Sequence, residues 1–107
     1  NKMIYMEQEI QKHNEIFIKK VNLFGMTFKF YIFKDSKGEY TNLALYKCNF
    51  FPRTYEELNV YFLDMIDGEE LDRLIKNDLR EYLMRPAIRE RVARYHWTVS
   101  AHSSSVK

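Results

Sequence analysis

Hydrophobic and polar positions alternate through most of the first half of the chain. Three stretches rich in β-branched and aromatic residues run from about 15 to 23, 27 to 34 and 40 to 50, and this alternation is typical of half-buried strands. The gaps between them, marked by Gly25 and by the run Asp35-Ser36-Lys37-Gly38, are too short for parallel connections. The pattern therefore predicts a three-stranded antiparallel meander.

The period changes after Pro52, which cannot donate to a strand ladder. Thr54-Tyr55-Glu56-Glu57 has the form of a capping box, and apolar residues at helical spacing follow, so we predict a helix over about 55 to 66. A second signature, Asp67-Gly68-Glu69-Glu70, precedes a broad apolar arc and predicts a helix over about 68 to 84. Asp78 falls inside this arc, where we expect a pairing with a neighbouring base or a place at the margin.

Two further helices are predicted at the ends of the chain. The apolar stripe from Ile88 to Val99 lies roughly 120° around the helix axis from the preceding arc, so one straight helix cannot bury both. Pro86 lies between them and starts a new helix over about 86 to 97. The segment from about 3 to 13 carries apolar residues at helical spacing and predicts an N-terminal helix.

These elements predict an α+β fold with an N-terminal helix, a three-stranded antiparallel meander and two to three C-terminal helices packed on one sheet face. We expect residues 1–100 to form a single domain and residues 101–107 a polar tail. A chain of 107 residues buries about two-thirds of its surface. Because the single Cys48 cannot form an internal disulfide and no apolar run approaches the roughly 18 residues of a membrane span, we expect a soluble cytoplasmic protein.

Charge is segregated along the chain, although the net charge is only +2. Residues 54–72 hold seven acidic side chains and no basic one, whereas the blocks before and after them carry an excess of Lys and Arg. A solvated surface is the plainest explanation. The sharper interpretation is an acidic patch that binds a basic protein partner, made of Asp64, Asp67, Glu69, Glu70 and Asp72.

Candidate chemistry is sparse. His13, His96 and His102 are scattered, Cys48 has no second cysteine, and three glycines provide no phosphate-cradling loop. A catalytic pairing of Cys48 with His96 would need a third orienting group. We therefore predict no intrinsic catalysis, no metal and no cofactor.

The aromatic and basic residues offer two kinds of binding surface. If the N-terminal helix leaves one sheet face open, aromatic side chains on that face suit a protein contact or stacking on single-stranded bases. Trp97 projects roughly 170° from the apolar stripe of its helix, as an interface anchor would. The candidate aromatic residues are Tyr31, Phe33, Tyr46 and Trp97, and the candidate nucleic-acid-binding residues are Lys29, Lys47, Arg85, Arg89, Arg91 and Arg94.

The expected order of helix, three strands and helix resembles that of double-stranded RNA-binding domains. That family has basic residues at the start of the helix after the sheet, where this chain has Glu56 and Glu57, so we assign no family.

Our first functional interpretation is a small non-enzymatic binding protein that docks on a basic, nucleic-acid-processing host protein. The composition is rich in the residues that AT-rich coding favours, which associates the chain with a phage or mobile element and an inhibitor or accessory role. A nucleic-acid-binding module that uses the Lys and aromatic sheet face and the basic last helix is the alternative. A self-associating protein, such as a homodimer, is the second alternative.

Overall fold

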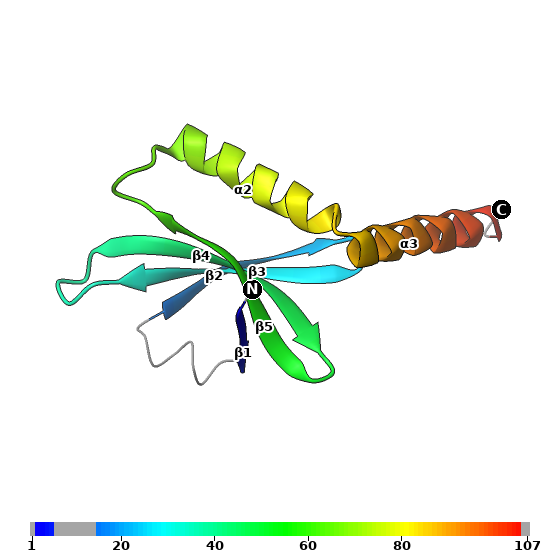
Figure 1. The fold of residues 1–107 in the computed structure, drawn as a ribbon, viewed down its shortest axis with the longest axis horizontal. Helices are drawn as coiled ribbons and strands as arrows, with labels where there is room; N and C mark the ends of the chain where they lie inside the picture. The colour runs from blue at the N-terminus through cyan, green and yellow to red at the C-terminus, as the bar shows by residue number, and fades with distance from the viewer. Residues whose placement is uncertain (1, 6–14, 106–107) are drawn as a thin grey trace.

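The computed structural model describes residues 2–5 and 15–105, which form an α+β fold with an antiparallel sheet and two helices (Figure 1). The sheet has five strands in the order β1-β5-β4-β3-β2. The strands are β1 (Lys2–Tyr5), β2 (Glu15–Leu23), β3 (Met26–Lys34), β4 (Tyr40–Phe50) and β5 (Arg53–Phe62). The helices are α2 (Gly68–Leu83) and α3 (Pro86–Ser105).

The predicted meander is confirmed as β2, β3 and β4, with antiparallel pairing throughout. Phe24 and Gly25 form the first turn with φ of 51° and 76°, the positive values that a tight two-residue hairpin requires. Asp35 organises the second turn, because its Oδ1 accepts hydrogen bonds at 2.9 Å from the backbone N–H groups of Lys37 and Glu39.

The helix predicted over 55–66 is wrong, because most of this segment is strand β5. Phe51 and Pro52 form a hairpin turn, and β5 pairs with β4 from Arg53 opposite Phe50 onward. The register shifts between Leu45 and Tyr46 of β4, and this bulge breaks the alternation that would identify a strand. Pairing with the long strand β4 thus determines the structure of this segment more strongly than its local capping pattern does.

The prediction of an N-terminal helix is wrong for its first residues. Lys2–Tyr5 is strand β1, which pairs antiparallel with β5 at the edge of the sheet, with Ile4 opposite Tyr55. The rest of the predicted helix lies outside the described residues. At the other end, α3 extends to Ser105, past the predicted end at residue 97 and into the segment expected to be a tail.

Helix α2 is confirmed and covers one face of the sheet (Figure 1). It begins at the N-cap Asp67, whose Oδ1 accepts a hydrogen bond from the Glu70 N–H at 2.8 Å. The arc predicted on α2 faces the sheet and supplies the buried Tyr82. It packs on the apolar side chains of the sheet, which include Met26, Phe28, Phe30, Leu45 and Tyr61.

The predicted break at Pro86 is confirmed, and α3 leaves the body of the molecule at an angle to α2 (Figure 1). Its first turns pack on the core through Ile88 and Val92. The following turns extend beyond the sheet, so the molecule measures 56 × 32 × 27 Å. Farther along α3, the rings of Tyr95 and His96 pack against Phe24 in the β2–β3 turn, with ring centroids 6.2 and 5.0 Å apart.

The opposite sheet face carries a second buried cluster, here called the tyrosine face. Tyr31, Tyr46 and Tyr55 pack their rings with centroids 5.5 to 6.0 Å apart. Their neighbours Ala44 and Cys48 are also buried. Both faces of the central strands are therefore covered, which explains why apolar residues point in both directions along β3 and β4.

Candidate functional site

The two β-hairpins part at one end of the sheet and leave a cleft, here called the hairpin cleft. Strands β3 and β4 stay paired up to Thr27 and Cys48, after which each turns into its own hairpin. The cleft has a volume of about 260 Å³ and takes its third wall from α3. Its lining residues are Gly25, Met26, Thr27, Lys47, Cys48, Asn49, Phe50, Phe51 and Arg91.

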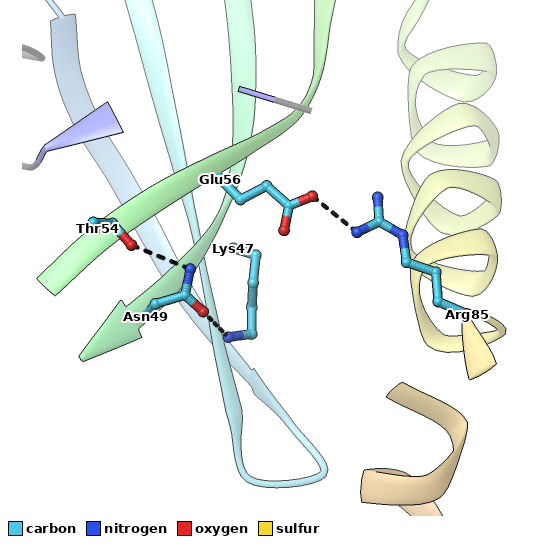
Figure 2. Close-up of polar contacts among 5 residues, drawn as sticks. All are labelled: Lys47, Asn49, Thr54, Glu56 and Arg85. Carbon is cyan, nitrogen blue, oxygen red and sulfur yellow. Dashed lines mark hydrogen bonds and ion pairs between the residues drawn. The ribbon is translucent and has the colours of Figure 1, made fainter. Parts of the chain in front are cut away.

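Lys47 is the buried charged residue of this cleft, with only 3% of its surface exposed. Its Nζ donates to the Cys48 backbone oxygen at 2.8 Å. It also donates to Asn49 Oδ1 at 3.0 Å (Figure 2). Burial, followed by the positive charge of Arg91, lowers the pKa of Lys47. The ammonium group is thus held by neutral oxygens.

The carboxylate opposite Lys47 in the pairing of β4 with β5 forms an ion pair with another residue. Glu56 lies opposite Lys47 on β5, but its Oε2 accepts from Arg85 Nη1 at 2.8 Å (Figure 2). The Arg85 guanidinium also stacks over the Tyr82 ring at 4.6 Å. Among the residues that the structure describes, no carboxylate lies within 4 Å of Lys47 Nζ. Arg85, a predicted nucleic-acid-binding residue, is instead part of the joint between α2, α3 and β5.

The arginines of α3 lie on both flanks of the helix. Arg91 lines the hairpin cleft, and Arg94 follows on the same flank one turn later. Arg89 lies on the other flank. All three are exposed, and none takes part in an ion pair with another described residue.

The tip of the β4–β5 hairpin presents two exposed aromatic side chains beside this cleft. Phe50 is 52% exposed and Phe51 is 100% exposed. Arg53 follows directly and pairs with Phe50 in the register. Sequence analysis missed these residues because it did not identify β5. The signal was present, since Phe-Phe-Pro-Arg separates two runs of strand-forming residues.

The basic residues predicted on one sheet face lie on opposite faces. Lys29 is opposite Tyr46 and points to the tyrosine face, where its Nζ donates to Tyr55 Oη at 3.1 Å. Lys47 points to the α2 side. Burial raises the pKa of the Cys48 thiol, and the positive charges of both lysines partly oppose this rise.

The predicted aromatic surface is divided by burial. Tyr31 and Tyr46 are only 6% and 1% exposed, so their rings belong to the core of the tyrosine face. Phe33 is half-buried against the same cluster. Trp97 is 75% exposed on the projecting part of α3. Of the four, Trp97 alone offers most of its surface to a partner in this structure.

The acidic residues predicted as a patch lie together at the start of α2, and most have local partners. Asp67 caps the helix, while Glu70 pairs with Arg73 at 3.3 Å and Asp72 pairs with Lys76 at 2.9 Å. Asp64 and Glu69 are exposed. This surface is therefore of mixed charge.

A titratable group that sequence analysis missed lies at the edge of the tyrosine face. Burial and the nearby Glu57 carboxylate raise the pKa of Glu15 from 4.5 to about 7. Its Oε2 is buried and, within the described part of the chain, has no hydrogen-bond partner. Burial, followed by the negative charges of Glu15 and Glu57, raises the pKa of Tyr46.

The candidate catalytic pair is not assembled in the described residues. Cys48 is 2% exposed, and burial raises the pKa of its thiol, whereas His96 packs on Phe24. Residues 2–5 and 15–105 contain no group of three His, Cys, Asp or Glu side chains arranged to hold a metal ion. Neither α2 nor α3 is long and apolar enough to cross a membrane.

The chain matches no protein-family model, and comparisons with curated proteins and with solved structures gave no significant match.

Proposed function

We propose that this protein binds single-stranded nucleic acid through the end of the molecule that carries the hairpin cleft. We call this surface the basic end and define it by Lys47, Phe50, Phe51, Arg91 and Arg94. Docking on a basic host protein was the first expectation from the sequence. The distribution of paired and unpaired charges instead favours the alternative, a nucleic-acid-binding module.

The observation that carries the proposal is an asymmetry in how the two charged ends are neutralised. At the acidic end, Glu70 and Asp72 have basic partners three and four residues along α2. At the basic end, Lys47, Arg91 and Arg94 form no ion pair with any described residue. A positive surface without ion pairs attracts a polyanion, whereas an acidic surface that is partly neutralised by its own basic residues attracts a basic protein less strongly.

The aromatic tip explains why we propose a single strand. Every unpaired base can stack on an aromatic ring whatever its identity, and each such contact contributes about 1 to 3 kcal/mol. Phe51 is fully exposed on the hairpin next to the positive cleft. Phosphates held by the arginines and bases stacked on the tip would follow one path along this surface.

Fluorescence anisotropy with a labelled oligothymidylate tests the proposal. Phosphate contacts by Lys47, Arg91 and Arg94 predict a slope of about −2 for the logarithm of the association constant against the logarithm of salt concentration. Phe51→Ala should weaken binding about tenfold while keeping this slope, since it removes stacking and no charge. Tyr40→Ala, an exposed ring on the opposite end of β4, is the matched control. No binding at low salt would refute the proposal.

A protein partner is the second candidate, and Trp97 is the observation that favours it. A side chain of this size that is 75% exposed on a projecting helix is a common interface anchor. Docking on a nucleic-acid-processing host protein, as a phage inhibitor would do, belongs to this candidate, and so does self-association. Light scattering of the pure protein detects a homodimer, which Trp97→Ala should dissociate. A retained host protein should likewise be lost with Trp97→Ala, and unchanged retention would exclude this anchor.

A further inference from the structure

We propose that the hairpin cleft is a binding site for one phosphate group, held between the ammonium of Lys47 and the guanidinium of Arg91. In a nucleic acid this group is a backbone phosphate, and that part of the inference rests on the proposed function. Free inorganic phosphate has the same chemistry and is the second source to be tested.

The first argument is the state of Lys47. An ammonium group has three N–H donors, and two of them meet Cys48 O and Asn49 Oδ1. A lysine that is 3% exposed and lacks a carboxylate partner in the described residues is an unusual arrangement, because buried charge is normally paired. A bound anion would use the remaining donor and supply the missing negative charge.

The surroundings of Lys47 show that this arrangement is built into the fold. Asn49, which accepts from Lys47, in turn donates through Nδ2 to Thr54 Oγ1 at 3.4 Å across the hairpin (Figure 2). Arg85 holds Glu56 away from the ammonium group. The lysine is therefore positioned by neutral groups, while the carboxylate that could neutralise it is held by another base.

The second argument is the position of Arg91. It lines the same cleft from α3 and is close enough for its charge to disfavour protonation of Lys47. Two like charges near one another are costly in the free protein, and an anion between them turns the repulsion into two attractions. A planar guanidinium and a point-like ammonium are the side chains that proteins most often use for phosphate.

The third argument is size. A cleft of about 260 Å³ is slightly smaller than the pockets of about 300 to 1,000 Å³ that enclose whole small-molecule ligands. It suits a phosphate group whose attached sugar and base lie outside. Phe50 and Phe51 line the same cleft and lie where such a base would emerge.

Two charge-neutral variants with a matched control test the site. Lys47→Met keeps the unbranched apolar part of the buried side chain and removes the ammonium group. Arg91→Gln changes an exposed residue, so this variant folds even if Lys47→Met does not. Arg89→Gln removes the same charge from the other flank of α3. We expect the first two to weaken oligothymidylate binding about tenfold each and to make the salt slope less negative by about 0.7 each, and Arg89→Gln to change affinity less than twofold.

A second arm separates the two sources of phosphate. Inorganic phosphate, compared with chloride at equal ionic strength, should raise the thermal midpoint of the wild type and of Arg89→Gln but not of Arg91→Gln. If the wild type binds no oligonucleotide yet shows this shift, the proposed function fails and the phosphate site stands. If oligonucleotide binds all variants equally and phosphate produces no shift, the proposed function stands and the phosphate site is overturned.

Discussion

Glu15 shows how one side chain can make stability depend on pH. Its carboxyl group is buried beside Glu57, and its pKa is raised from 4.5 to about 7. Between these values the folded chain holds a proton that the unfolded chain has released. The contribution of Glu15 to stability is therefore fully present below pH 4.5 and is lost as the pH rises through 7.

The first prediction follows from the direction of this pH dependence. The free energy of unfolding should fall by about 2 kcal/mol from the acidic to the alkaline side of this window, a value that allows for partial solvation of the group. Glu15→Gln should remove most of this decrease, because the amide does not titrate. Urea unfolding at a series of pH values measures it. Glu69→Gln is the control, and an identical pH dependence in both variants would contradict the assignment.

Asp78 is a second residue whose contribution depends on individual hydrogen bonds, and its partners were only partly predictable from the sequence. The sequence indicated that this carboxylate inside the apolar arc of α2 either pairs with a neighbouring base or lies at the margin of the arc. The partners are neutral, since Tyr61 Oη donates to Asp78 Oδ2 at 2.6 Å and Asn59 Nδ2 donates to the same oxygen at 2.7 Å. Because both donors come from β5, they were hidden by the failure to identify that strand.

The second prediction concerns this contact between α2 and β5. Tyr61→Phe should lower the free energy of unfolding by about 1.5 to 3 kcal/mol, the range for a hydrogen bond to a charged group. In an Asp78→Asn background the same change should cost less, because the acceptor is no longer charged. Urea unfolding of the four proteins gives the coupling energy. Equal costs in both backgrounds would show that the hydroxyl acts independently of Asp78.

At the scale of elements, the sequence predicted what local rules determine. Period-2 alternation identified β2, β3 and β4, and the capping signature at Asp67 together with Pro86 located α2 and the break before α3. Strand β5 depends on partners far away in the sequence. It pairs with β4 and β1. Because it is buried on both faces and contains a bulge, its apolar residues do not alternate regularly, and their spacing resembles that of a helix. The hairpin cleft was unpredictable for the same reason.

The third prediction tests how the β2–β3 turn supports α3. Gly25 has a φ of 76°, and a Cβ there would approach Tyr95 Cδ2 to 3.3 Å, whereas Gly38 has a φ of 81° and open space around it. Both Gly→Ala changes should cost about 1 to 2 kcal/mol from backbone strain. Gly25→Ala should cost additional free energy of unfolding, because its Cβ approaches Tyr95. This additional cost should vanish when Tyr95 is also changed to Ala. Thermal unfolding of the five proteins measures this, and equal costs at the two glycines would show that Tyr95 yields freely.

For the whole molecule, the charge segregation of the sequence is only partly kept in space, because Glu56 of the acidic block lies against Arg85. Helix α2 begins at the acidic end and runs toward the joint with α3, where the arginines lie (Figure 1). The sequence identified the two kinds of charge but could not show which of them the fold neutralises. That distinction depends on one i to i+3 pair and one i to i+4 pair on α2 and on the ion pair between Glu56 and Arg85.

The fourth prediction asks whether the position of charge or the total charge governs binding. Arg91→Gln with Arg94→Gln removes two charges from the basic end, and Arg73→Gln with Lys76→Gln removes two from the outer surface of α2. Both double variants have the same net charge. Because interactions beyond about 10 Å are largely screened at 0.1 M salt, only the first should lose affinity for oligothymidylate, by about one hundredfold.

The control pair is safe to change, because exposed ion pairs such as Arg73 with Glu70 and Lys76 with Asp72 contribute little to stability. Circular dichroism would confirm that both double variants fold, and anisotropy at several salt concentrations would compare them. Equal losses in the two would mean that a diffuse positive field attracts the nucleic acid and that the hairpin cleft has no special part in it. A loss confined to the first variant would place the contact at the end of the molecule where the two hairpins part beneath α3.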